Sequence, residues 1–278
     1  MPGTFREYAD GKELFGDSFS PAEIEEWYQD EKEGYFNLGQ FLHPGEGHRK
    51  GNYGYGALNR RYGFRHLPDT VRFEQVLAIG GAFGEELEPV VDRANHVTIL
   101  EPSDGFIHER YQYVKPQANG KMEFPDASFD LVTCFGVLHH IPNVSFVIKE
   151  VSRCMKPGAW LLLREPIESM GNWDLPRPGL TRRERGIPFA IMLEIVRGAG
   201  LDIVRARRCM FAVTAKIQAV LTRYGGVYDT PWVVALDDHV SNLPVWPRQY
   251  HARNFIQKFR PLSVYLVARK PEGYLSHR

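Results

Sequence analysis

The fold of this chain is decided by residues 76–101, VLAIGGAFGEELEPVVDRANHVTILE. An apolar run, Val76–Ile79, meets a glycine-rich turn, Gly80–Gly84, and Glu85 then opens a helical pattern. A second apolar run, Val97–Leu100, is followed directly by an acidic residue, Glu101. Glycines let the backbone approach a ligand, a helix N-terminus offers free N–H groups, and an acid after the next strand can accept hydrogen bonds from ribose hydroxyls. This order predicts a nucleoside site, although glycine turns after strands also serve as plain connections.

The composition is that of a globular protein. Of 278 residues, 43% are hydrophobic, and 34 basic side chains balance 34 acidic ones, which argues against a nucleic-acid or membrane-surface role. No apolar run approaches membrane-spanning length and no apolar signal core follows Met1, so we expect a cytoplasmic protein. The cysteines (Cys134, Cys154, Cys209) lack metal-ligand spacing and are interpreted as reduced core residues. No metal site is expected, although Mg²⁺ held by scattered carboxylates stays open.

Residues 1–70 do not follow a parallel-sheet pattern and are predicted to form an N-terminal cap or lid. Ser20, Pro21 and Glu23 make a capping box that predicts the start of a helix. An aromatic, glycine-rich stretch follows, in which Tyr53 and Tyr55 are candidates to line a pocket. A simply packed N-terminal arm is the alternative.

Residues 71–278 alternate strand and helix patterns, which predicts an α/β fold with a doubly wound, mostly parallel sheet. A stretch rich in Trp, Tyr and Pro, about residues 210–260, is long for a loop and is expected to have structure of its own. The expected strands are Arg72–Ile79, Val97–Leu100, Tyr113–Pro116, Phe129–Phe135, Ala159–Arg164, Leu201–Arg205 and Leu262–Ala268, and the expected helices begin at Glu85 or cover Ser103–Tyr111, Asn143–Met155 and Pro188–Gly198.

Two further segments carry a family resemblance, FPDASFDLVTCFGVLHHIPN (124–143) and KEVSRCMKPGAWLLLREP (149–166). With the glycine turn they resemble the class I S-adenosylmethionine-dependent methyltransferases, in the small-molecule branch similar to enzymes of quinone biosynthesis (type 11). The resemblance covers about residues 72–205 and the final strand. It implies a seven-stranded, Rossmann-like sheet with the last strand antiparallel, and S-adenosyl-L-methionine as cofactor.

The resemblance also implies which residues hold that cofactor. The chain departs from the family at Ala78, where an Asp near the methionine amine is usual, at Ala82, where Gly is usual, and at Ala118, where an acid is expected. By position, the resemblance places the methionine end of the cofactor at Gly80, Gly81 and Ala82 and its ribose at Glu101. The adenine would lie near Pro102, Ala118 and Asn119, and the backbone around Cys134 and Phe135 would meet the amino-acid moiety.

Methyl transfer to an alcohol needs a base for the hydroxyl proton, and histidine suits that because its pKa lies near neutrality. His139 and His140 follow strand four, and Glu165 follows strand five. Open α/β sheets bind ligands at this edge, so we expect His140, oriented by Glu165, to be the base, with His139 as the second candidate. A structural role of the histidine pair in the turn is the alternative.

The segment after strand five is expected to overhang the acceptor. Trp173 and Asp174 are a pair suited to a sugar, and Arg177 and Arg182 could hold a phosphate; a structural loop whose arginines pair with the acidic N-terminus is the alternative.

These patterns predict an O-methyltransferase of a carbohydrate, sugar phosphate or glycosylated small molecule. A quinone, polyketide or lipid acceptor, or a catalytically inactive binding or scaffold protein, stays open. Neither the acceptor nor the oligomeric state follows from the sequence.

Overall fold

The computed structural model describes residues 4–42, 53–221 and 226–273. Its centre is a pair of parallel strands, β1 (Phe73–Ile79) and β4 (Phe129–Phe135), whose side chains are mostly buried on both faces because helices cover both sides. Seven strands follow the order β3-β2-β1-β4-β5-β7-β6. Of the described strands, β7 alone points in the opposite direction to the others, so that it pairs antiparallel with both β5 and β6. The predicted seven-stranded, mostly parallel sheet is confirmed. The other strands are β2 (Ala94–Leu100), β3 (Gln112–Val114), β5 (Met155–Pro166), β6 (Asp202–Phe211) and β7 (Pro261–Arg269).

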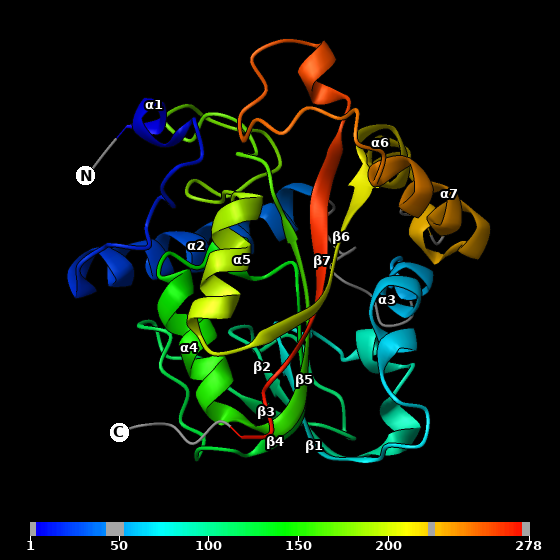
Figure 1. Cartoon of the computed structure of the whole chain (residues 1–278). Coiled ribbons are helices and arrows are strands. Elements are labelled where there is room, and N and C mark those ends of the chain that lie inside the picture. The colour runs from blue at the N-terminus through cyan, green and yellow to red at the C-terminus, as the bar shows by residue number, and fades with distance from the viewer. Residues whose placement is uncertain (1–3, 43–52, 222–225, 274–278) are drawn as a thin grey trace.

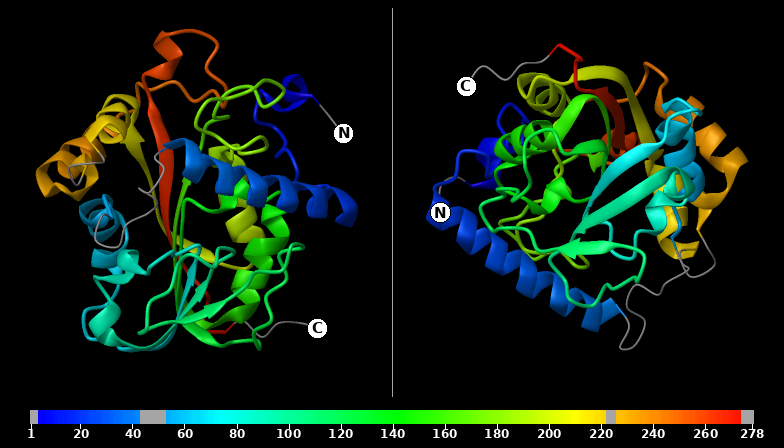
Figure 2. Two further views of the ribbon diagram at one scale, coloured as in Figure 1. Left: turned by 180° about the vertical axis from the view of Figure 1, so that it is seen from behind. Right: turned by 90° about the horizontal axis from the view of Figure 1, so that it is seen from below.

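Helices lie on both faces of this sheet (Figure 1). On one side are α4 (Val144–Cys154), α5 (Phe189–Gly198) and the N-terminal α2 (Pro21–Leu42), and on the other are α3 (Gly56–Tyr62), α6 (Ala212–Leu221) and α7 (Pro231–Ser241). Figure 2 shows the same arrangement from behind and from below. The short helices are α1 (Phe5–Tyr8), η1 (Phe64–His66), η2 (Glu85–Leu87), η3 (Val91–Arg93), η4 (Leu138–His140), η6 (Val227–Asp229) and η7 (Ile256–Lys258).

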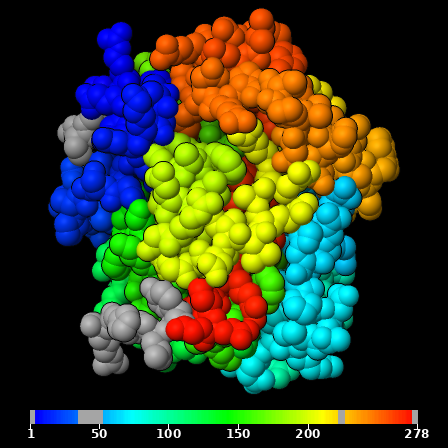
Figure 3. Space-filling model, in the orientation of Figure 1, coloured from blue at the N-terminus to red at the C-terminus, as the bar shows by residue number. Residues whose placement is uncertain are grey.

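The region between β6 and β7 has structure of its own, as expected from its length. It contains α6 and α7, which pack beside β6, and α7 also contacts α3. The segment then continues over one end of the sheet (Figure 1), and in the space-filling view it runs in orange across the top of the molecule (Figure 3). Among the described residues, no helix combines the length and apolarity needed to cross a membrane.

Two expected helices are wrong. After Glu85 the chain makes only the 3-10 turns η2 and η3, because Pro89 cannot donate to the carbonyl of Glu85 and its ring would clash there. The segment 103–111 is irregular: Ser103 Oγ accepts the Gly105 N–H at 3.1 Å, a local bond that competes with a helical turn. In the part of the chain that the structure describes, the segments after β1 and β2 are therefore 3-10 turns and irregular chain in place of the two expected helices.

The helix predicted by the capping box begins where it was expected. The Ser20 N–H donates to Glu23 at 2.8 Å, and α2 begins at Pro21. A separate apolar cluster joins the N-terminal segment to the loop after β5 and to the β6–β7 region; its members are Phe5, Phe15, Phe19, Ile24, Trp27, Trp173 and Tyr250. All three cysteines are buried and free.

Candidate cofactor and active site

The turn after β1 lies against the acid after β2. The Ala82 N–H donates to Glu101 Oε2 at 3.3 Å, and the Ser103 N–H donates to Glu101 Oε1 at 3.0 Å. Burial raises the pKa of Glu101, and these two N–H bonds oppose that shift. From β3, the Tyr113 hydroxyl donates to the Ala82 carbonyl at 2.9 Å. Residues from three strand ends thus fix the turn and the carboxylate side by side.

The backbone of the turn is tight. Gly80 has φ 65°, and a Cβ there would lie 2.4 Å from Val137 Cγ2, so this position requires glycine. Ala82 also has a positive φ, 45°, which is strained for a residue with a side chain. The family's usual Gly at this position would carry no such strain, which gives the departure at Ala82 a physical cost.

The remaining cofactor candidates lie near the same edge with different exposure. Cys134 and Phe135 are buried at the end of β4. Pro102 is exposed and its carbonyl accepts a bond from Lys115 Nζ at 3.1 Å. Ala118 is half-buried; Asn119 is exposed and uses its carbonyl and its side-chain oxygen to accept bonds from Asn143 and Lys121.

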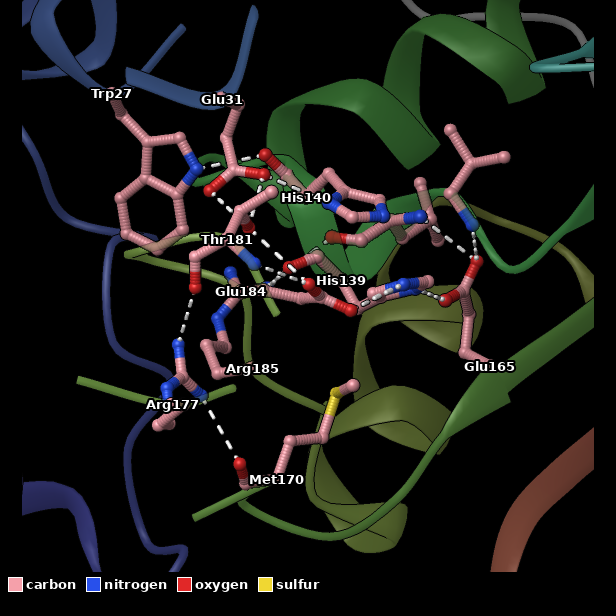
Figure 4. A network of polar contacts seen from close by, with 12 residues as sticks. Trp27, Glu31, His139, His140, Glu165, Met170, Arg177, Thr181, Glu184 and Arg185 are labelled. Carbon is pink, nitrogen blue, oxygen red and sulfur yellow. Dashed lines mark hydrogen bonds and ion pairs between the residues drawn. The ribbon is translucent and has the colours of Figure 1, made fainter. Parts of the chain in front are cut away.

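The histidine pair makes different contacts from those expected (Figure 4). Glu165 pairs with His139, whose Nδ1 lies 2.8 Å from Glu165 Oε2, and its other oxygen accepts the N–H groups of Val137 and Leu138 at 2.8 Å each. The partner of His140 is instead Glu31 of α2, with Nδ1 2.8 Å from Oε2. The predicted His140–Glu165 pair is therefore wrong, because β5 and η4 aim Glu165 at the first histidine of the turn.

His139 lies between two buried carboxylates. Its Nε2 is 3.4 Å from Glu184 Oε1 while its Nδ1 contacts Glu165. Burial opposes protonation, but the hydrogen bonds that His139 donates to Glu165 and Glu184 outweigh it and raise the pKa of His139 to about 9. His139 is thus an imidazolium near neutral pH and serves to hold η4 to β5 and to the loop at 184.

Three ligand-type atoms of this network, one each from His139, His140 and Glu184, lie within 4.8 Å of one another. A histidine binds a metal ion only as a neutral imidazole with a free lone pair. Because both ring nitrogens of His139 face carboxylates and its pKa is raised, this group fits a protonated ion-pair network better than a metal site.

The predicted acceptor residues of the loop 165–188 contact other parts of the chain, although Asp174 and Arg182 are exposed. Trp173 is buried and stacks on Phe15 with ring centroids 4.9 Å apart, and Asp174 accepts the Phe5 N–H at 2.9 Å. Arg177 donates to carbonyls within its own loop, and Arg182 lies 3.6 Å from Asp30 of α2.

The neighbouring arginines behave in the same way. Arg183 pairs with Glu26 and Asp30 at 2.6 Å each, and the fully buried Arg185 donates to carbonyls of η4 and of Phe15. These contacts match the alternative in which the arginines pair with the acidic N-terminus.

Tyr53 and Tyr55 lie on the opposite face, next to β5. The Tyr53 hydroxyl bonds to Asn59, and Tyr55 stacks on Tyr228. The guanidinium of Arg164, 8% exposed, lies 4.3 Å above the Tyr55 ring and donates to Asn59 Oδ1 at 3.2 Å. Among the described residues, no contact of Arg164 involves a carboxylate, so a buried positive charge faces aromatic rings at this strand end.

Residues 77–163 match the family described as "Methyltransferase domain". The match begins in β1, contains the glycine turn and Glu101, and ends in β5. Residues 77–163 therefore form a methyltransferase domain. S-adenosyl-L-methionine is the cofactor of this family, and the methyltransferase domain includes the turn, the carboxylate and the histidine pair described above.

Curated relatives match parts of the chain. The sequence is 38% identical over 50 residues to "Ubiquinone biosynthesis O-methyltransferase" of Paracidovorax citrulli, which is 18% of this chain and 21% of that protein. It is 30% identical over 125 residues to "Fusarielin synthase FSL1" of Gibberella zeae, 40% of this chain but 4% of that protein. Against a Mycolicibacterium smegmatis protein named "Probable S-adenosylmethionine-dependent methyltransferase", identity is 25% over 61% of this chain and 71% of the relative. The chain thus spans a small part of the first two relatives.

Solved structures agree in fold. A methyltransferase from Archaeoglobus fulgidus superposes with a TM-score of 0.51 at 16% identity, covering 77% of this chain and 92% of its own. A chain of the complex between the Haloferax volcanii Trm112 methyltransferase activator and a methyltransferase gives 0.53 at 13% identity, covering 90% and 98%. At these identities the likeness concerns the fold of the methyltransferase domain alone.

Several residues of the site were missed by sequence reasoning. Glu31, Glu184 and Arg164 lie far from the glycine turn in sequence, and their roles depend on packing between segments. A sequence signal did exist for Glu86 of η2, because β1 carries Ala78 where the family usually has an acid and Glu86 is an acid shortly after the glycine turn.

Proposed function

We propose that this chain is an S-adenosylmethionine-dependent O-methyltransferase of a hydroxylated small molecule. The observation that carries the proposal is the contact of Glu101 with the Ala82 N–H, because it sets a ribose-type carboxylate against the glycine turn at the carboxyl edge of the sheet. When bound, the cofactor would supply an electrophilic methyl group. Gly80, Gly81 and Ala82 would lie at its methionine end, Glu101 at its ribose and Pro102, Ala118 and Asn119 near its adenine.

His140 is the proposed base, and Glu31 takes the orienting role that the sequence predicts for Glu165. Its Nδ1, 2.8 Å from Glu31 Oε2, donates to the carboxylate in the neutral ring, which leaves Nε2 as the basic atom. The His140 side chain is 27% exposed, whereas that of His139 is 11% exposed and its pKa is raised to about 9 by its two carboxylate neighbours. These differences support His140 over His139 as proton acceptor.

For the acceptor, the contacts favour a flat hydroxylated compound such as a quinol or phenol. Trp173, Asp174 and Arg177, on which the carbohydrate hypothesis rested, are used by internal contacts, whereas Tyr55 offers an aromatic surface next to the buried positive charge of Arg164 at the end of β5. The partial match to a ubiquinone-biosynthesis O-methyltransferase points the same way.

Two measurements test these proposals. Calorimetric titration with S-adenosylhomocysteine tests the cofactor site, and absence of heat at millimolar ligand would leave the scaffold alternative. Methyl transfer from isotopically labelled cofactor is then measured with a panel of hydroquinones, catechols, free sugars and nucleotide sugars. Labelled quinol or phenol ether is the expected product; methylated sugar alone would return the acceptor to the carbohydrate class.

A further inference from the structure

A buried glutamate lies beside the glycine turn. Glu86, 5% exposed, is carried by η2, and Thr133 Oγ1 donates to its Oε1 at 2.7 Å. Thr133 lies on β4 directly opposite Ala78 on β1 in the strand register. The Glu86 carboxyl group therefore lies over the strand pair at the position where β1 carries only a methyl group.

Geometry at Gly81 places the same carboxyl group next to the turn itself. A Cβ built on Gly81 would lie 2.9 Å from Ala78 Cβ and 3.7 Å from Glu86 Oε1. An aspartate at residue 78, usual in the family, would project toward this same space. Glu86 thus brings a carboxyl group from the following turn to the region that a strand-one acid would otherwise reach.

The surroundings of Glu86 suit a cationic ligand. Its hydrogen-bond partner among the described residues is a neutral hydroxyl, and Arg164 acts on it only as a more distant charge, while Glu101 opposes ionisation. Burial is the largest effect and raises the pKa of Glu86 to about 7. A buried carboxylate without a close cation is unfavourable, and an ammonium group would relieve that cost.

We propose that Glu86 replaces the missing strand-one acid and binds the ammonium group of the methionine moiety of S-adenosylmethionine. The inference rests on the proposed function, since it assigns a residue to the same cofactor site. It explains how a chain with Ala78 can retain a negative charge for the methionine end. The extra reach of glutamate compensates for its place on η2, and the small Ala78 side chain leaves room for it.

The test compares two ligands that differ in the group concerned. S-adenosylhomocysteine carries the ammonium group and no sulfonium, whereas 5′-methylthioadenosine carries neither. Isothermal titration with Glu86→Gln, which keeps the shape and the bond to Thr133, should show affinity for S-adenosylhomocysteine reduced about ten- to a hundredfold. Affinity for 5′-methylthioadenosine should change less than threefold. Glu88→Gln, an exposed glutamate on the same turn, is the matched control and should leave both affinities unchanged.

A second variant guards against loss of structure. Ala78→Asp in the Glu86→Gln background restores an acid on β1 and should recover most of the affinity for S-adenosylhomocysteine. Equal affinities of wild type and Glu86→Gln for S-adenosylhomocysteine would overturn the inference while leaving the proposed function standing. Parallel loss of both ligands, without recovery in the double variant, would also overturn it. A wild-type chain that binds neither ligand overturns the proposed function as well.

Discussion

Glu31 in α2 and His140 in η4 form a hydrogen-bonded pair, with Oε2 and Nδ1 2.8 Å apart although 109 residues separate them in sequence. The same glutamate accepts bonds from the Thr181 hydroxyl at 2.7 and 2.8 Å, so α2, η4 and the loop after β5 meet at one carboxylate. The N-terminal segment thereby orients the proposed base. Whether residues 1–70 also act as a lid stays a prediction.

Replacing this histidine tests its role. His140→Ala should lower turnover by about 10²- to 10⁴-fold with cofactor affinity unchanged, as expected for loss of a general base. Glu31→Gln should lower turnover less, because the ring keeps a hydrogen-bond partner but loses the charged one. Rates come from single-turnover methyl transfer and affinity from calorimetry. Glu25→Gln, an exposed change on the same helix, is the control, and an unchanged rate in His140→Ala would assign His140 to structure.

The ribose assignment is tested at Glu101. Glu101→Gln should weaken S-adenosylhomocysteine and 5′-methylthioadenosine binding alike, by about ten- to a hundredfold, because both ligands carry the ribose. Asp104→Asn, at an exposed acid three residues further on, should bind like wild type. Wild-type affinity in Glu101→Gln would refute the assignment. The equal effect on both ligands separates this residue from Glu86.

Backbone strain at Ala82 predicts a stabilising substitution. Ala82→Gly should raise the free energy of unfolding by up to about 1 kcal/mol, since glycine adopts φ 45° without the Cβ penalty. Ala127, exposed and at φ 52°, gives a matched control: Ala127→Gly should stabilise similarly. Only Ala82→Gly should change cofactor affinity, upward, because it widens the turn. Urea denaturation and calorimetry measure the two effects, and a destabilised Ala82→Gly would show that the methyl group packs favourably.

The ion pairs of His139 predict a pH dependence of stability. Its folded-state pKa, about 9, lies above the ordinary 6.5, so the stabilisation is fully present below pH 6.5 and is lost as pH rises through 9. The full contribution is on the order of 3 kcal/mol. Urea unfolding of wild type and His139→Gln from pH 6 to pH 10 should show the difference between them shrinking with rising pH. His96→Gln, at an exposed histidine, is the control; a constant difference would mean that His139 is not protonated in the fold.

The sequence predicted the strands well because buried parallel strands are continuous apolar runs ending in glycine or acid. Val76–Ile79 and Phe129–Phe135 are of this kind, and both are strands of the central pair. It failed where a helical pattern was broken locally. Pro89 ends the turn begun at Glu85, and the Ser103 hydroxyl captures the N–H of Gly105.

The site was predictable only in its local part. Glu101 and Ala82 lie at the ends of adjacent strands, so their contact follows from the topology. The partners of His139 and His140 depend instead on how α2 and the loop at 181–185 pack over η4. Sequence spacing carries no information on which of two adjacent histidines faces β5.

The borders of the matched segment, residues 77–163, do not coincide with a unit that can fold alone. Glu31, Glu184 and Lys270 lie outside it, yet each supplies a buried bond to a group within it: to His140, to His139 and to the carbonyls of Ser152 and Met155. If residues 77–163 were excised, the two histidines and the two carbonyl groups would lose these hydrogen-bond partners. The cooperative unit of this protein therefore extends from the N-terminal helix to the end of the last strand, well beyond the part that homology defines.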